Sequence, residues 1–117
     1  MNALRFLLLA IATYIVVDGD TIKAPYGVTY RLMGYDTPET RFAKCDAERE
    51  LGLAAKVRLE ELLTQGDVKV LESGKEDRYG RSLAEVTVNG RDVGTTLIGE
   101  GLARPYQGGK RASWCGL

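Results

Sequence analysis

The chain has 117 residues, of which 44% are hydrophobic, and its 16 basic and 16 acidic residues leave a net charge of zero. This length suits one domain of about 100–150 residues, and zero net charge excludes an overall electrostatic attraction to nucleic acid. The absence of histidine excludes the usual general base, the serine and cysteine triads and the commonest zinc ligand, so any catalysis would depend on carboxylates, arginines, tyrosines or a metal ion.

The N-terminal stretch RFLLLAIATYIVV has features of an export signal. It begins with Arg5, continues as an apolar run, and contains Ala10-Ile11-Ala12, which has the form of a signal-peptidase site. The run is shorter than the ~18 residues that span a bilayer, so no stable membrane span is predicted. We interpret residues 1–12 as a signal-peptide remnant or hydrophobic extension, with a hydrophobic first strand as the alternative, and residues 13–117 as one domain.

Three short strands are expected next. Residues 13–17 are β-branched and aromatic and end at the turn Asp18-Gly19-Asp20, after which residues 21–23 resume as a strand. The stretch VTYRLMGYD then predicts a strand in which Arg31 lies on the face opposite Tyr30. Arg31 is therefore expected to project from a rigid element.

A long helix and a hairpin follow. In DAERELGLAAKVRLEELLTQG, apolar residues recur at helical spacing, Asp46 can cap the start and Gly66 can end the helix. DVKVLE predicts a strand, and SLAEVTVNGRDV predicts a hairpin because Asn89-Gly90 suits a type I′ turn. TTLIGEGLARPY predicts a second, short helix, and QGGKRASWCGL a loop.

This order of elements is that of an OB-fold, a partly open five-stranded Greek-key barrel that often binds nucleic acid or oligosaccharide. The predicted fold class is therefore α+β, mainly β, with two flanking helices. The residues predicted to form its core are Tyr30, Leu59, Leu62, Leu83, Val86, Leu97, Leu102 and Trp114.

Carboxylates and arginines are concentrated near the strand ends. Asp20 follows one strand, and Asp36 with Glu39 follows another; three clustered carboxylates repel unless a cation lies between them. Carboxylate oxygens suit Ca²⁺ or Mg²⁺, and a backbone carbonyl near Thr37 could add a ligand. Arg31, with Arg78 and Arg81 further along the chain, could bind phosphate oxygens bidentately.

Taken singly, each of these segments is better explained by a turn or by surface ion pairs than by a functional site. Their co-occurrence in the blocks VVDGDTI, RLMGYDTPET, EDRYGRSLAEV and VGTTLIGEGLARPY resembles the staphylococcal nuclease (thermonuclease) family over about residues 13–106. The resemblance implies an SNase-like OB-fold and a monomeric, calcium-dependent nuclease. Such an enzyme hydrolyses DNA, preferably single-stranded, and RNA to 3′-phosphorylated products.

By matching position, the resemblance also implies residue roles. The carboxylates of Asp20 and Asp36 and the carbonyl of Thr37 would bind Ca²⁺, and Asp18 would support these ligands from behind. Glu39 would act as general base or orient the attacking water. The predicted phosphate-binding arginines are Arg31 and Arg81, and the predicted substrate-binding residues are Arg78, Tyr79 and Tyr106.

Two cysteines, Cys45 and Cys115, lie too far apart for a CxxC motif. The residues alone leave two alternatives, a bridge that implies an oxidising compartment or two unrelated thiols. KCDAE and GGKRASWC resemble a bacterial subgroup of the family with a helix-to-tail disulfide, which favours pairing and a periplasmic or secreted location over a cytoplasmic one.

A non-catalytic nucleic-acid-binding module of the same fold is the alternative function. Such modules lose acids or arginines of the active set. Asp20, Arg31, Asp36, Glu39 and Arg81 are all present here, which favours the enzyme.

Overall fold

The computed structural model describes residues 13–116, so the predicted export segment at residues 1–12 lies outside the described residues. Within residues 13–116, no helix combines the length and the apolar character needed to cross a membrane.

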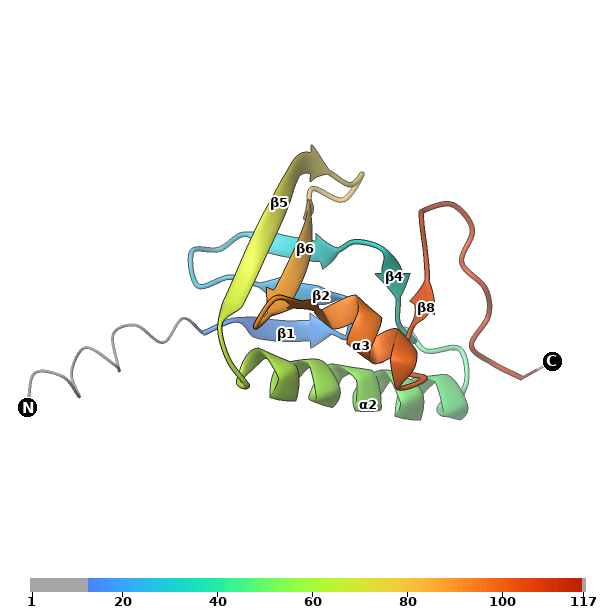
Figure 1. Ribbon diagram of the computed structural model, residues 1–117. Helices are drawn as coiled ribbons and strands as arrows, with labels where there is room; N and C mark the ends of the chain where they lie inside the picture. The colour runs from blue at the N-terminus through green and yellow to red at the C-terminus, as the bar shows by residue number, and fades with distance from the viewer. Residues whose placement is uncertain (1–12, 117) are drawn as a thin grey trace, which may run out of the picture.

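Five main strands form one sheet in the order β1-β2-β3-β6-β5. Neighbouring strands are antiparallel except β3 and β6, which run parallel with Arg31 opposite Leu83. These strands are β1 (Ile15–Asp18), β2 (Thr21–Lys23), β3 (Thr29–Leu32), β5 (Val68–Glu76) and β6 (Ser82–Val88) (Figure 1). The mainly β, SNase-like OB architecture is thus confirmed, although the sheet does not close into a barrel.

Three two-residue strands complete the β structure of the described chain. β7 (Arg91–Asp92) pairs with β6 across the predicted hairpin, whose Asn89 and Gly90 have φ of 52° and 81° as a type I′ turn requires. β4 (Tyr35–Asp36) pairs with β8 (Arg104–Pro105) in a small separate sheet. This second pairing, which the sequence pattern did not predict, places Asp36 at the start of the C-terminal segment, residues 106–116.

Two helices are present among residues 13–116, α2 (Asp46–Leu63) and α3 (Val93–Gly99). The prediction that Asp46 caps α2 is wrong, because Cys45 holds the N-cap position and Asp46 forms an exposed ion pair with Arg49 instead. The prediction that Gly66 ends α2 is also wrong. The Thr64 hydroxyl donates to the Glu61 carbonyl at 2.7 Å and closes the last turn earlier.

The hydrophobic core lies between the sheet and the two helices. Of the predicted core residues, Tyr30, Leu59, Leu62, Val86 and Leu97 are buried. Leu83, Leu102 and Trp114 are only half-buried, because Leu83 lines a surface cleft, Leu102 flanks the core, and Trp114 packs on Arg104.

Two glycines allow the loops of the site to approach α2 closely. A Cβ atom at Gly19, in the turn after β1, would lie 2.8 Å from the Cβ atom of Ala55. A Cβ atom at Gly52 would lie 2.5 Å from the carbonyl oxygen of Glu39. Both separations are shorter than any ordinary carbon contact, so each position needs glycine for the turn after β1 and the loop after β4 to lie against the helix.

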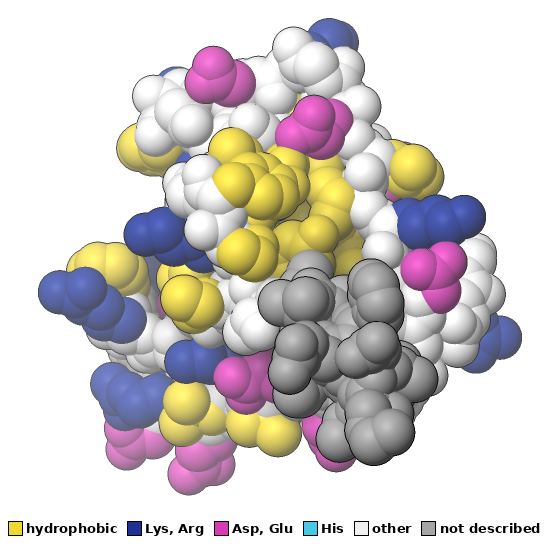
Figure 2. Space-filling view, turned by 90° about the vertical axis from the view of Figure 1, so that its left-hand side faces the viewer, with side chains coloured by type: hydrophobic (Ala, Val, Ile, Leu, Met, Phe, Trp, Pro, Cys, Tyr) yellow, Lys and Arg dark blue, Asp and Glu magenta, His cyan; other side chains and the backbone are white. Residues whose placement is uncertain are grey.

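Figure 2 views the end of the molecule opposite the C-terminal segment. Hydrophobic side chains gather in a hollow near the middle of this face, with charged side chains around them. The carboxylates of Asp20, Asp36 and Glu39 lie elsewhere, in the turn after β1, on β4 and in the loop after β4.

Candidate active site

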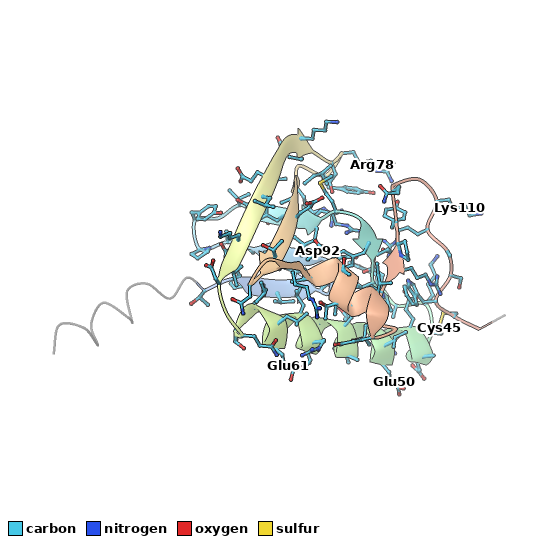
Figure 3. The ribbon with its side chains drawn as sticks, viewed as in Figure 1. Cys45, Glu50, Glu61, Arg78, Asp92 and Lys110 are labelled. Atoms are coloured by element: carbon cyan, nitrogen blue, oxygen red, sulfur yellow. A yellow bond between two sulfur atoms is a disulfide. The ribbon has the colours of Figure 1, made fainter. Side chains whose placement is uncertain are left out.

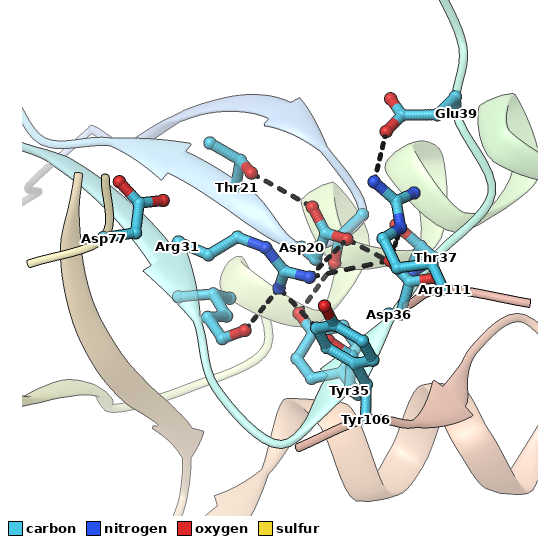
Figure 4. Close-up of polar contacts among 12 residues, drawn as sticks. Asp20, Thr21, Arg31, Tyr35, Asp36, Thr37, Glu39, Asp77, Tyr106 and Arg111 are labelled. Atoms are coloured by element: carbon cyan, nitrogen blue, oxygen red, sulfur yellow. Dashed lines mark hydrogen bonds and ion pairs between the residues drawn. The ribbon is translucent and has the colours of Figure 1, made fainter. Parts of the chain in front are cut away.

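Asp20 and Asp36 are buried although both carry carboxylates, with only 7% and 3% of their surfaces exposed. Asp20 lies in the turn between β1 and β2, and its carbonyl accepts a hydrogen bond from the Leu32 amide at 2.8 Å. This bond ties the turn to the end of β3, close to β4, which carries Asp36. One guanidinium nitrogen of Arg31, Nη2, lies 3.4 Å from Asp20 Oδ2 and 3.5 Å from Asp36 Oδ1 (Figure 4).

The other terminal nitrogen of Arg31 is held by main-chain acceptors. Its Nη1 donates to the carbonyls of Leu32 at 2.6 Å and Tyr35 at 3.1 Å. Asp20 is fixed in turn, because its Oδ1 accepts from the Thr21 hydroxyl at 3.0 Å and its Oδ2 from the Thr37 amide at 3.1 Å. The strand-borne part of the site is therefore organised by its own backbone.

The Oδ1 atom of Asp36 is the most unusual atom of the site. It lies 2.9 Å from Nε of Arg111, but these atoms are not aligned for a hydrogen bond, so within the described residues this buried oxygen has ion pairs and no hydrogen-bond donor. Such an oxygen suits a hard cation, because a cation needs a lone pair rather than a donor. The oxygen donors of Asp20 and Asp36 thus fit Ca²⁺ or Mg²⁺.

Glu39 lies at the edge of this cluster, with 28% of its side chain exposed. Its Oε1 lies 2.9 Å from Nη1 of Arg111, and its amide donates to Oε2 of Glu48 at 3.0 Å. The loop that carries Glu39 is therefore fixed to α2 at its backbone, while the carboxylate points toward Arg111 (Figure 4).

Glu48 is a buried carboxylate in the first turn of α2. It accepts from the amides of Lys44 at 2.9 Å and Glu39 at 3.0 Å. Burial by itself raises the pKa of Glu48, but these two donors and the nearby charge of Arg111 outweigh burial and hold the pKa below its usual range. Glu48 thus anchors the loop of Glu39 as an ionised acceptor.

Asp18 lies behind the cluster, where its Oδ1 accepts from the Thr40 hydroxyl at 2.9 Å. Burial, together with the negative charges of Asp20 and Glu39, raises the pKa of Asp18 although the hydrogen bond from Thr40 opposes the shift. The side chain therefore adds negative charge close to the acids and also braces the loop after β4.

Arg81 reaches the site from the loop between β5 and β6. Its Nε donates to Oδ2 of Asp77 at 2.6 Å, and its Nη1 lies 3.5 Å from the Thr21 hydroxyl. Asp77 also accepts from the amides of Tyr79 and Arg81, each at 2.9 Å. Burial raises the pKa of Asp77, but these hydrogen bonds and the Arg81 charge lower it below its usual value. Asp77 is therefore a stable anion that orients the Arg81 guanidinium.

Two tyrosines lie beside these arginines. Tyr79 is 69% exposed, and the guanidinium carbons of Arg78 and Arg81 lie 5.1 and 5.5 Å from its ring centre. Tyr106 lies 5.9 Å from the guanidinium carbon of Arg31, and its hydroxyl donates to the Gly109 carbonyl at 2.6 Å.

A cleft of about 700 Å³ connects the two tyrosines. Arg78, from the β5–β6 loop, and Lys110, from the C-terminal segment, both line it and are labelled in Figure 3. Arg31, Arg81 and Arg111 also line the cleft. Its basic and aromatic lining can bind a phosphate and stack a base.

The C-terminal segment is fastened to the start of α2. Cys45 and Cys115 form a disulfide with their Cα atoms 6.0 Å apart, which confirms the predicted pairing. Next to it, the Arg104 guanidinium lies 3.5 Å above the Trp114 ring, and the Trp114 Nε1 donates to Asp36 Oδ2 at 3.4 Å. Trp114 is therefore a neighbour of the carboxylates, so its prediction as a simple core residue is wrong.

The structure brings Asp20, Arg31, Asp36 and Thr37 into one cluster, to which Arg111 links Glu39, with Asp18 behind it and Arg81 beyond Thr21. Arg78, Tyr79 and Tyr106 line the adjoining cleft. Sequence reasoning missed Arg111, Trp114 and Glu48 as members of the site. The block GGKRASWC contained the only signal for Arg111 and Trp114, and there it was used solely to pair the cysteines.

Fold and site together define a small β protein with a cluster of buried carboxylates beside an arginine-lined cleft. A profile described as Staphylococcal nuclease homologue matches residues 29–113, and the chain belongs to this family.

The chain is similar to several curated proteins. It is 42% identical to the SPbeta prophage-derived endonuclease YokF of Bacillus subtilis (strain 168), over 75% of this chain and 31% of that protein. It is 41% identical to Endonuclease YncB of the same organism, over 75% of this chain and 44% of that protein. It is 39% identical to Thermonuclease of Staphylococcus intermedius, over 76% of this chain and 55% of that protein. The matched part therefore spans from about a third to just over half of these relatives.

Proposed function

We propose that this chain is a calcium-dependent nuclease that hydrolyses phosphodiester bonds of DNA, preferably single-stranded, and of RNA, leaving 3′-phosphorylated products. The observation that carries the proposal is the contact of one guanidinium, that of Arg31, with the two buried carboxylates Asp20 and Asp36, beside an arginine-lined cleft. Membership of the nuclease family and the endonuclease names of the relatives support it.

Asp20 and Asp36 would hold Ca²⁺ through their carboxylates, and Thr37 through its carbonyl. When bound, the cation supplies a positive charge that stabilises the phosphoryl oxygens. The hard oxygen donors and the buried Asp36 oxygen without a hydrogen-bond donor support this assignment.

Arg31 and Arg81 bind the phosphate. Arg31 is pre-positioned by two carbonyls and Arg81 by Asp77, so neither guanidinium has to be ordered when the substrate arrives. Their planar groups can donate two hydrogen bonds each to phosphoryl oxygens, and these bonds strengthen as negative charge grows on the oxygens in the transition state. The two arginines thus stabilise the transition state more than the bound substrate.

Glu39 orients the attacking water and accepts its proton. The water oxygen forms the new bond to phosphorus as the bond to the 5′ oxygen breaks in line with it, and the leaving 5′ oxygen takes a proton from solvent water. Glu39 suits this task because its backbone is fixed by Glu48 and its carboxylate remains partly exposed. The products are a 3′-phosphate and a 5′-hydroxyl.

Tyr79 and Tyr106 support the preference for single strands. Tyr79 is mostly exposed at the rim of the cleft, and an unpaired base can stack on an aromatic ring, whereas a base in a duplex is already stacked. Because the chain has no net charge, attraction to the polynucleotide is local to the cleft and the salt dependence of binding is modest.

We further propose that the protein acts as a monomer outside the cytoplasm, in the periplasm or as a secreted protein. The disulfide between Cys45 and Cys115 supports an oxidising compartment.

The release of acid-soluble product from heat-denatured DNA and from RNA tests the proposed function. Cleavage is expected with Ca²⁺, no cleavage is expected with a chelator, and end-group analysis is expected to find 3′-phosphates. If the folded protein binds single-stranded DNA but does not cleave it in the presence of any divalent cation, the proposal is overturned in favour of a binding module.

A further inference from the structure

Arg111 stands between two features that the proposed function treats separately. On one side its Nε lies 2.9 Å from Asp36 Oδ1 and its Nη1 lies 2.9 Å from Glu39 Oε1. On the other side it lines the cleft that also contains Arg31 and Arg81. One guanidinium therefore contacts the acids, as Figure 4 shows, and also lines the cleft.

The contact with Asp36 conflicts with a cation at the same place. Asp36 Oδ1 is the oxygen that Arg111 approaches, and it is also the buried oxygen without a hydrogen-bond donor that suits a metal. Arg111 approaches this oxygen to 2.9 Å, closer than the 3.5 Å of Arg31, and a guanidinium at that distance repels a divalent cation that contacts the same oxygen. Arg111 and the cation therefore compete for Asp36.

The C-terminal segment allows Arg111 to change partners while its ends stay in place. Before Arg111, the Tyr106 amide donates to the Gly34 carbonyl at 3.0 Å. After it, Cys115 is bonded to Cys45. The Arg111 side chain itself is 38% exposed, so its long stem can rotate toward the cleft without any loss of packing in the core.

We propose that Arg111 is a third phosphate-binding arginine that exchanges partners. It pairs with Asp36 and Glu39 until a cation binds to the acids, and it then turns to the substrate phosphate. This inference rests on the proposed function, because it requires a cation at Asp20 and Asp36. The exchange couples binding of the cation to binding of the substrate phosphate, because the cation frees the Arg111 guanidinium for the phosphate. When Arg111 turns away, the Glu39 carboxylate is left open to water.

The exchange predicts effects of opposite sign for Arg111→Gln. Calorimetric titration with Ca²⁺ alone is expected to show binding about three- to tenfold tighter than in the wild type, because the competing guanidinium is gone. With Ca²⁺ saturating, fluorescence anisotropy of a phosphorothioate oligonucleotide is expected to show binding about tenfold weaker. The slope of the logarithm of the binding constant against the logarithm of the salt concentration should become shallower by about 0.7, the contribution of one phosphate contact.

Arg91→Gln is the matched control, because Arg91 is an exposed arginine on β7, and it should change neither affinity. Arg111→Lys should keep part of both effects, since the charge remains and the planar fork is lost. Unchanged or weaker Ca²⁺ binding by Arg111→Gln, or unchanged oligonucleotide binding, would overturn the exchange. A folded wild type that binds no Ca²⁺ would instead overturn the calcium part of the proposed function, and the exchange with it.

Discussion

The two halves of the candidate site are built in different ways. The half formed by Asp20, Arg31 and Asp36 lies on or directly beside strands. Arg31 is held by the nearby carbonyls of Leu32 and Tyr35, and Asp20 by the Thr21 hydroxyl and the Thr37 amide. The half formed by Arg111 and Trp114 belongs to a segment without helix or strand, joined to α2 by a disulfide that spans 70 residues of sequence. The first half is therefore organised locally and the second by a long-range covalent link.

This difference predicts that the halves can be separated experimentally. Loss of the disulfide should release Arg111 and Trp114 and leave Asp20, Arg31 and Asp36 in place. Changes in the strand-borne half should instead affect chemistry directly, because its residues contact the proposed cation and phosphate.

Replacement of both cysteines, as Cys45→Ser with Cys115→Ser, has the largest expected effect. Closing a loop of this length contributes about 4 kcal/mol in the chain-entropy model, so the free energy of unfolding in urea should fall by about that amount. Trp114 is the only tryptophan, and its fluorescence should change at urea concentrations where the far-ultraviolet circular dichroism is still native. If fluorescence and dichroism changed together, the C-terminal segment would not be an independent unit.

Arg31→Lys probes the strand-borne half. We expect the rate of DNA cleavage to fall roughly 10²–10³-fold, because lysine keeps the charge but loses the paired donors that stabilise the phosphoryl oxygens. The fluorescence of Trp114 should be unchanged, and Arg91→Lys serves as the control. A near wild-type rate would remove Arg31 from the mechanism.

Glu48→Gln has the smallest expected effect and tests the contact by which Glu48 on α2 holds the loop of Glu39. Because the folded-state pKa of Glu48 lies below its ordinary value of about 4.3, its stabilising contribution is present above that pH and lost as the pH falls through the lowered pKa. The variant should be about 1–2 kcal/mol less stable at neutral pH. The difference in the free energy of unfolding between the variant and the wild type should disappear in acid.

Glu60→Gln, an exposed change on the same helix, is the control for this experiment. Urea denaturation at several pH values measures both variants. A difference between Glu48→Gln and wild type that persisted at the lowest pH would show that Glu48 acts through packing rather than through its charge.

The sequence predicted the strand-borne half well because its signals are local. Alternation placed Arg31 on the face opposite Tyr30, and the Asp18-Gly19-Asp20 turn placed Asp20 at a strand end, where it contacts Arg31. The ends of α2 were predicted wrongly, since Thr64 closes the last turn through a side-chain bond that a helical pattern does not reveal.

Arg111 and Trp114 could not be predicted from spacing. Their positions depend on the disulfide and on the pairing of β4 with β8, both of which join residues far apart in the chain. A run such as GGKRASW is typical of a solvated loop, and nothing in its local pattern indicates that Arg111 contacts Asp36.

The cleavage rate of single-stranded DNA by Glu39→Gln tests the central claim most directly, that these acids and arginines form one hydrolytic site. We predict that the variant binds Ca²⁺ and a phosphorothioate oligonucleotide but cleaves DNA roughly 10²–10⁴-fold more slowly, while Glu50→Gln, an exposed change on α2, cleaves at the wild-type rate. Wild-type cleavage by Glu39→Gln would contradict the account.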